Sequence, residues 1–163
     1  MPSAPFQPDP AFMRLALREA MDHLAAIDGG PFGACIMRGE AVLAVAHNTV
    51  LKENDPSCHA EINAIRLASR RLGTYDLSGC AIYSTTEPCP MCFAAIHWAR
   101  IAHLVYGTAI ADVAALGFNE LTISNEQMQA AGRSPVIIYP EFLVEECRDL
   151  LQQWLATPGH RIY

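Results

Sequence analysis

Residues 80–107, CAIYSTTEPCPMCFAAIHWARIAHLVYG, decide the fold class of this chain. The apolar run at 80–84 predicts a buried strand, the residues from about Cys89 to Arg100 predict a helix, and 103–107 predict another strand. Two strands joined through a helix by short loops normally run parallel in one sheet. The stretch therefore predicts a layered α/β protein.

The segments on either side of this stretch extend the pattern. They predict a helix from Asp9 to about Gly29, a β-hairpin at 34–37 and 41–46, helices at 59–72, 126–132 and 143–155, and a fifth strand at 135–139. Residues 112–125 show little periodicity. No repeat or linker divides residues 1–163, so we expect a single domain with a flexible surface segment at 1–8 and a short tail at 157–163.

The composition narrows the possible partners. The 163 residues include 11 Lys and Arg against 17 Asp and Glu, and the net charge of -6 without a basic cluster argues against nucleic acid. Hydrophobic residues make up 52% of the chain, which favours a compact, self-associating protein. No apolar run approaches the roughly 20 residues of a membrane span. We expect a cytoplasmic protein without disulfides, whose cysteines outside the Cys-x-x-Cys pair act as small hydrophobic residues.

Two short motifs carry the chemistry. His59 and Glu61 lie at the predicted start of one helix, and Cys89 and Cys92 lie at the start of the next. His59, Cys89 and Cys92 offer three zinc ligands, which leaves the fourth tetrahedral position for water, as in catalytic zinc sites. Glu61 is then free to take a proton from that water and pass it to a substrate.

A redox function is the alternative for the two cysteines. A strand followed by Cys-Pro-x-Cys and a helix is also typical of thioredoxin-like oxidoreductases. Dithiol exchange, however, requires neither Pro88 nor the upstream His59-Ala60-Glu61. The two motifs together favour a metal site.

These motifs resemble the signature of the zinc-dependent cytidine deaminase-like superfamily, which is H-x-E followed by P-C-x-x-C. The residues around them resemble the bacterial guanine deaminases most: Gly29-Gly30-Pro31-Phe32-Gly33, Asn54-Asp55-Pro56, His59-Ala60-Glu61-Ile62-Asn63 and Leu116-Gly117-Phe118-Asn119-Glu120. The resemblance implies a three-layer α/β/α fold with a central mixed five-stranded sheet. It also implies one zinc ion per subunit and conversion of guanine to xanthine and ammonia, with attack by a zinc-held hydroxide and Glu61 as proton shuttle.

The resemblance extends to further candidate site residues. It implies that Glu120 is a second proton carrier, that Asn48 binds the base, and that Tyr163 reaches the pocket of a partner in a homodimer with exchanged C-terminal segments. Without it, Glu120 would be read as an exposed carboxylate and Asn48 as a turn residue. Phe32 is a candidate for stacking on a purine and Trp98 for lining the pocket, although either aromatic residue also fits a packing role.

Several alternatives remain open at this point. A tRNA adenosine deaminase shares the metal motif, and guanosine, cytosine or an amino-triazine such as ammeline offers a similar amine to the site. A non-catalytic zinc or dithiol module is the alternative from a different class. Five other histidines have no ligand spacing and are predicted to be structural or exposed: His23, His47, His97, His103 and His160.

Overall fold

The computed structural model describes residues 5–163 and contains one five-stranded sheet in the order β2-β1-β3-β4-β5. β1 pairs antiparallel with β2 and β3, whereas β3, β4 and β5 run parallel, so the predicted mixed sheet is confirmed. The strands are β1 (Gly33–Arg38), β2 (Ala41–His47), β3 (Ala81–Thr86), β4 (His103–Thr108) and β5 (Ile137–Tyr139).

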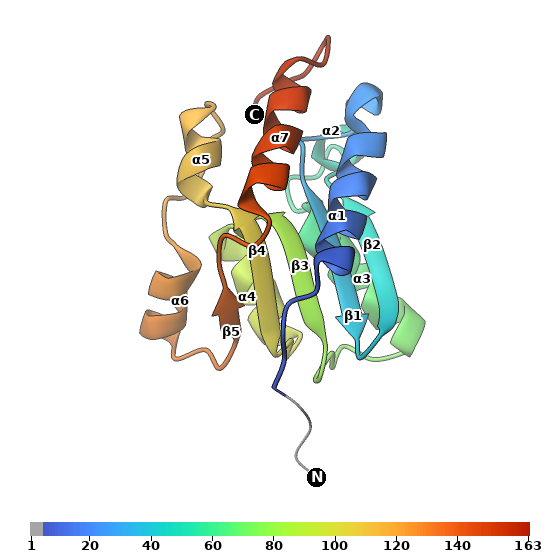
Figure 1. Cartoon of the computed structure of the whole chain (residues 1–163), viewed down its shortest axis with the longest axis vertical. Coiled ribbons are helices and arrows are strands. Elements are labelled where there is room, and N and C mark those ends of the chain that lie inside the picture. The colour runs from blue at the N-terminus through green and yellow to red at the C-terminus, as the bar shows by residue number, and fades with distance from the viewer. Residues whose placement is uncertain (1–4) are drawn as a thin grey trace.

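Helices cover both faces of the sheet, which confirms the three-layer arrangement. α1 (Pro10–Asp22) and α7 (Val144–Leu155) lie side by side on the face turned to the viewer in Figure 1. α3 (Ala60–Leu72) and α4 (Pro90–Trp98) cover the other face. α5 (Ile110–Ala115) and α6 (Asn125–Gly132) lie beyond β4, near the β5 edge.

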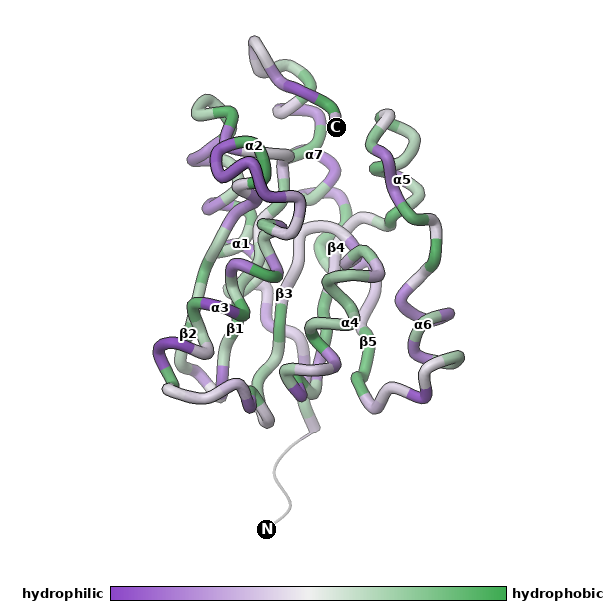
Figure 2. The backbone as a smooth tube through the Cα atoms, turned by 180° about the vertical axis from the view of Figure 1, so that it is seen from behind, coloured by the Kyte–Doolittle hydropathy of each residue, from purple (hydrophilic) through white to green (hydrophobic). Residues whose placement is uncertain are grey.

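The hydrophobic core lies in two layers against the sheet. Every residue of β3 is buried, as expected for a central strand covered on both faces. Ile82 belongs to the core beneath α3 and α4, whereas its neighbour Tyr83 belongs to the core beneath α1 and α7, because successive side chains point to opposite faces. Figure 2 shows mostly hydrophobic residues along α4 and the central strands.

Most predicted elements are present, with two differences in helix content. The first helix ends at Asp22 and is followed by a 3₁₀ turn, Leu24–Ala26, which ends at Ile27 in a left-handed conformation with φ of 54°. α2 (Val50–Glu53) and α5 were not expected. These two helices have 4 and 6 residues, too few to produce a helical repeat in the sequence.

The N-terminal segment is only partly as expected. Residues 1–4 of the predicted flexible segment lie outside the described residues, and residues 5–8 form no regular structure. Phe6 nevertheless packs on the sheet: its ring stacks on His103 with 4.1 Å between ring centroids and contacts Tyr139. Within residues 5–163, none of the helices is long and apolar enough to cross a membrane.

None of the six cysteines, which all lie within residues 5–163, forms a disulfide. Burial raises the pKa of Cys35 to about 12. Burial is also the main reason why the pKa of Cys147 is raised to about 12. These two thiols therefore stay protonated at neutral pH and act as core residues.

Candidate metal centre and active site

The three predicted zinc ligands meet where two helices begin. His59 and Cys89 are the N-cap residues of α3 and α4, and Cys92 lies in the first turn of α4. His59 Nδ1 is 3.6 Å from Cys89 Sγ and 3.5 Å from Cys92 Sγ. Zinc bond lengths of about 2.0 Å to nitrogen and 2.3 Å to sulfur place tetrahedral ligand atoms ~3.6 Å apart. The donor set therefore fits one zinc ion.

The two thiols are not equivalent. A hydrogen bond from Cys92, together with the contact to His59, lowers the pKa of Cys89 to about 4, even though burial opposes this shift. Donation to Cys89 and burial raise the pKa of Cys92 well above its ordinary value. Zinc binds cysteine as the thiolate, so Cys92 would have to give up its proton to serve as a ligand, whereas Cys89 gives up its proton more readily.

His59 also carries opposing influences. Burial lowers the pKa of its imidazole, but the hydrogen bond to Cys89 and the negative charges of Glu61 and Cys89 raise it, and the net direction is upward. A metal ion binds the neutral ring, so zinc also competes with a proton at this position.

Glu61 lies in the first turn of α3 with only 6% of its surface exposed. Its Oε1 accepts a hydrogen bond from Ser84 Oγ at 3.1 Å, and Oε2 lies 3.5 Å from Cys92 Sγ. Burial is the main reason why the pKa of Glu61 is raised. A buried carboxyl with a raised pKa beside three metal donors is suited to carry a proton.

A cavity of about 290 Å³ opens over the donors and continues into an inner recess of about 30 Å³. The volume is near the lower limit of the roughly 300–1,000 Å³ found for ligand sites, so it suits a small molecule. Five residues line both spaces: Phe32, Asn48, His59, Cys89 and Glu120. These five residues were all predicted from the sequence, and they surround the same opening as Glu61, which lines the inner recess.

Glu120 belongs to an irregular segment between α5 and α6. Burial raises the pKa of its carboxyl, and the charge of Cys89 contributes in the same direction. The structure thus places Glu120 at the cavity rather than on the open surface, and its carboxyl, like that of Glu61, holds a proton more readily than an exposed one.

The amide of Asn48 is held in one orientation. Its Oδ1 accepts hydrogen bonds from the Val50 N–H at 3.0 Å and from the Tyr163 hydroxyl at 2.8 Å. Because the oxygen is occupied, the Nδ2 donor is the group left for a ligand. Gly29 approaches this residue so closely that an added Cβ would lie 2.7 Å from the Asn48 carbonyl oxygen.

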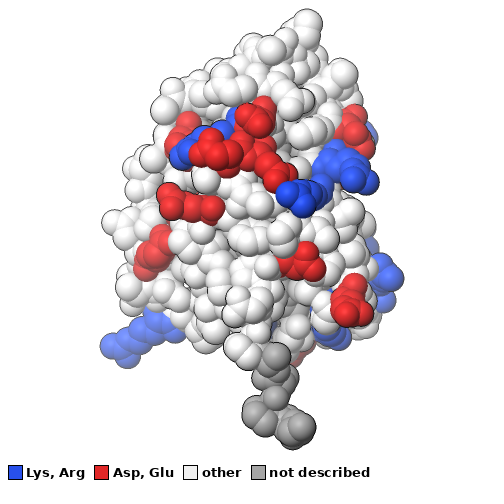
Figure 3. All heavy atoms as spheres, viewed as in Figure 1, with Lys and Arg blue, Asp and Glu red and all other residues white. Residues whose placement is uncertain are grey.

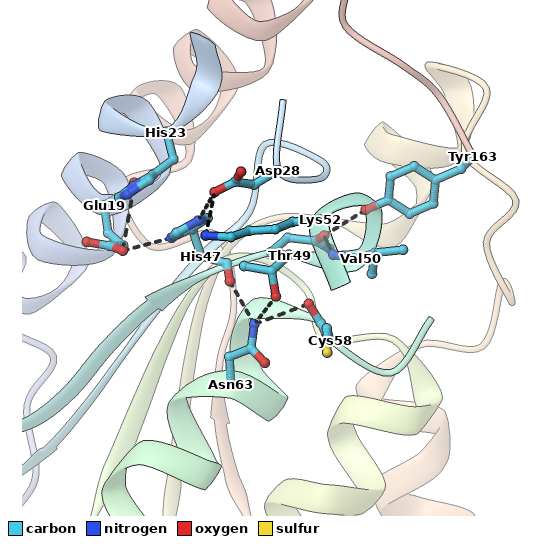
Figure 4. Close-up of polar contacts among 11 residues, drawn as sticks. Glu19, His23, Asp28, His47, Thr49, Val50, Lys52, Cys58, Asn63 and Tyr163 are labelled. Carbon is cyan, nitrogen blue, oxygen red and sulfur yellow. Dashed lines mark hydrogen bonds and ion pairs between the residues drawn. The ribbon is translucent and has the colours of Figure 1, made fainter. Parts of the chain in front are cut away.

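Tyr163 lines the cavity of its own chain, and Figure 4 shows its hydroxyl pointing towards the turn that carries Val50. Its hydroxyl accepts a hydrogen bond from the Gly30 N–H at 3.0 Å while it donates to Asn48. Phe118 packs edge to face against both Tyr163 and Phe32. Phe32 therefore both packs against Phe118 and lines the cavity, and its stacking on a purine stays a prediction.

Trp98 does not line this cavity, and within the single chain that prediction is wrong. It is the last residue of α4, nine residues after Cys89, or ~13 Å along the helix at 1.5 Å per residue. Its side chain is 77% exposed and lines a separate groove with Tyr75 and Pro135.

Among the other histidines, His47 lies in a polar cluster at the end of β2 (Figure 4). Its Nδ1 is 2.8 Å from Glu19 Oε1 and its Nε2 is 2.9 Å from Asp28 Oδ2. The ring also stacks on His23, with centroids 3.7 Å apart and planes 12° from parallel. One metal ion cannot lie in the planes of two stacked rings, so we interpret this cluster as structural support for the neighbouring Asn48.

Two functional candidates were missed from the sequence. Ser84, on β3, contacts Glu61, and Glu87, just beyond β3, lines the inner recess. Ser84 and Glu61 are 23 positions apart, so no local spacing connects them. The local signal was that Ser84 and Glu87 lie near the carboxyl end of β3, and α/β proteins commonly bind their ligands at the carboxyl ends of parallel strands.

Comparison with known proteins places this site in a family. Residues 7–108 match the family model of the cytidine and deoxycytidylate deaminase zinc-binding region. Guanine deaminase of Bacillus subtilis (strain 168) is 40% identical over 152 residues, which cover 93% of this chain and 97% of that protein. The tRNA-specific adenosine deaminase of Aquifex aeolicus (strain VF5) is 42% identical over 97 residues, which cover 58% of this chain and 62% of that protein.

Solved structures give the same result. Guanine deaminase from Nitrosomonas europaea superposes with a TM-score of 0.82 at 30% identity, covering 93% of this chain and 87% of that one. The guanine deaminase structure from Bacillus subtilis has a TM-score of 0.67 at 32% identity, and the match covers 96% of this chain and 99% of that one. The chain therefore belongs to the zinc-dependent family of the cytidine and deoxycytidylate deaminases.

Proposed function

We propose that this protein is a guanine deaminase that converts guanine and water to xanthine and ammonia. The observation that carries the proposal is the convergence of the buried carboxyl of Glu61, the partly buried carboxyl of Glu120 and the oriented amide of Asn48 on a small cavity beside three zinc donors. The guanine deaminase of Bacillus subtilis supports the same substrate, because it matches along almost its entire length, whereas the tRNA deaminase match covers 58% of this chain.

In the proposed reaction, a bond from water oxygen to C2 of the purine forms and the bond from C2 to the exocyclic amine breaks. His59, Cys89 and Cys92 would hold a zinc ion, which would supply a Lewis acid that lowers the pKa of water at the site. Glu61 accepts the proton released from water and delivers it to the ring nitrogen beside C2. Glu120 donates a proton to the departing amine, which leaves as ammonia; the C2 hydroxyl loses its proton as the carbonyl forms, and this proton returns to the Glu120 carboxylate, so no net proton is consumed.

Two further residues would position the substrate. Asn48 Nδ2 donates a hydrogen bond to an acceptor on the purine edge, and the fixed amide favours one orientation of the base. The ring of Phe32 packs against the purine face. The small cavity favours a free base over a nucleoside, since Tyr163 and Phe118 already occupy part of its wall.

A tRNA substrate is the weaker alternative. The net charge is -6, and on the face of the molecule seen in Figure 3 the Lys and Arg side chains are interspersed with Asp and Glu and form no continuous stripe. Binding to an RNA backbone depends on such basic residues. The proposal is tested by ammonia release from guanine, guanosine, adenine, cytosine and ammeline, with a tRNA transcript assayed for inosine. Guanine should react fastest and give xanthine; inosine formation without guanine turnover would refute the assignment.

We also propose that the protein functions as a homodimer whose subunits exchange the tail 157–163. Trp98 and Tyr75, 77% and 69% exposed, line an apolar groove of the kind that marks protein contacts. With exchanged tails, Asn48 and Gly30 of one subunit would make the same contacts with a Tyr163 that comes from the other subunit. The free cysteines fit a reducing compartment such as the cytoplasm.

Subunit complementation tests the exchange. A chain lacking 157–163 retains its donors and Glu61, and a Glu61→Gln chain retains its tail, so each should be inactive alone. If tails are exchanged, refolding the two together forms mixed dimers with one complete site and restores activity. If mixed dimers form but stay inactive, each tail serves its own chain.

A further inference from the structure

Glu87 connects the metal site to the segment that carries Glu120. It directly precedes Pro88 and Cys89 and is 6% exposed. Its Oε2 accepts the backbone N–H of Ile110 at 2.9 Å, and its Oε1 accepts the backbone N–H of Asn125 at 2.8 Å. These are the first residues of α5 and α6, so one carboxylate holds both ends of the segment 110–125.

The attachment of α6 has a second component. Asn125 is fully buried, and its Nδ2 donates to the Pro88 carbonyl oxygen at 2.6 Å. Its Oδ1 has no partner among the described residues. Glu87 is itself fixed to the sheet, because its N–H donates to the Thr108 carbonyl oxygen at 2.7 Å. The turn before Cys89 thus binds both β4 and the start of α6.

The segment between these attachments has little structure of its own. Residues 116–124 contain no helix or strand, and Leu121 and Ile123 are 66% and 47% exposed. Glu120 nevertheless reaches the inner recess, which Glu87 also lines. None of the side-chain hydrogen bonds found among residues 5–163 involves the Glu120 carboxylate. Its position therefore depends on how the segment is held at its ends.

We propose that Glu87 is a positioning residue that fixes the Glu120 segment against the turn that bears Cys89. Two backbone donors from helix starts match the two acceptor oxygens of one carboxylate. A glutamine in its place offers only one acceptor and turns an amide N–H₂ toward the other donor. The inference rests on the proposed role of Glu120 in proton transfer.

The central test is Glu87→Gln, alone and combined with Glu120→Gln. The single variant should bind one zinc per chain and lose kcat by roughly 10- to 100-fold, the range for losing one hydrogen bond to a charged group. KM should change little, because the hydrogen bonds that orient Asn48 come from Val50 and Tyr163 and not from Glu87. If Glu87 acts through Glu120, the double variant should be no slower than Glu120→Gln alone.

Hydrogen exchange provides a readout that does not depend on activity. In zinc-loaded Glu87→Gln, peptides covering 109–125 should exchange faster, while peptides from α1 and β1 should be unchanged. Asn125→Ala removes only the bond to Pro88 and keeps the N–H for Glu87, so it should show a smaller effect in the same direction. Glu126→Gln is the matched control, since this residue is also in the first turn of α6 but bonds only to Tyr106.

The outcomes separate this inference from the proposed function. Unchanged exchange at 109–125 in Glu87→Gln, or independent rate losses that multiply in the double variant, would overturn the positioning role. A Glu120→Gln enzyme with normal turnover would instead refute the proton carrier, and a wild-type protein inactive on guanine would refute the substrate. In either case the exchange experiment still determines whether Glu87 holds the segment.

Discussion

Replacing Glu61 with glutamine should change activity and stability in opposite directions. The substitution keeps the shape of a side chain that is 6% exposed, and the amide oxygen can still accept the hydrogen bond from Ser84. It removes the carboxyl assigned to proton transfer, which contributes about 10²–10⁴-fold in enzymes generally. We therefore expect kcat on guanine to fall by about 10²–10⁴-fold, or ~2.7–5.4 kcal/mol. KM and zinc content should remain close to wild type.

The stability of the zinc-free protein should increase. Burial raises the pKa of Glu61, so its charged form opposes folding. A carboxyl with a raised pKa contributes stability below its unfolded pKa of about 4.3 and loses this contribution as the pH rises through the folded value. The advantage of Glu61→Gln should thus be absent at low pH and grow as the pH rises. Relief of a poorly compensated buried group is worth on the order of 1 kcal/mol, or ~2–4 °C in Tm.

Thermal unfolding of chelator-treated wild type and Glu61→Gln across a pH series measures this effect. With zinc bound, the gain should shrink, because the positive ion stabilises a neighbouring carboxylate. Ammonia release and metal analysis on the same samples give the other half of the prediction. Normal turnover, or a variant less stable than wild type at every pH, would refute the reasoning, and loss of zinc would make Glu61 a ligand.

Three further outcomes are expected. Gly107→Ala should lower the free energy of unfolding, measured by urea titration, by about 1–3 kcal/mol, because the new Cβ would lie 2.7 Å from Cys147 Cβ. The control is Gly132→Ala, which should be neutral or stabilising because no atom lies within 4 Å of the added Cβ. Ser84→Ala should reduce kcat by about 2- to 12-fold, the loss of one hydrogen bond to Glu61; an unchanged kcat would remove Ser84 from the site. Purified protein should contain one zinc per chain, and chelation should lower its Tm and abolish turnover.

The parts of the site that could be predicted are those with a local pattern. His59, Cys89 and Cys92 combine ligand chemistry with positions at helix starts, and both properties are readable over a few residues. Glu120 and Asn48 have no such pattern and were predicted only through resemblance. Their place at the cavity arises from an irregular segment and a strand end.

The errors and omissions have equally specific causes. Trp98 was a candidate for lining the pocket, but it is the last residue of α4, and the nine residues of this helix separate it from Cys89 at the other end. Glu87 was passed over because its partners are backbone N–H groups 23 and 38 positions away. Backbone groups have no sequence signature, so contacts of this kind become visible only in the fold.

Sheet topology explains why these long-range contacts converge on the metal site. β3 and β4 run parallel, so their carboxyl ends lie at the same edge of the sheet. From the end of β3 come Ser84, which contacts Glu61, and Glu87, which holds the starts of α5 and α6. The same strand then leads into Cys89 and α4. The end of β3 therefore helps to position three groups: Cys89 directly, Glu61 through Ser84, and Glu120 through Glu87. Because Glu87 acts on Glu120 and is not itself a metal donor, a change at Glu87 should affect turnover without removing zinc.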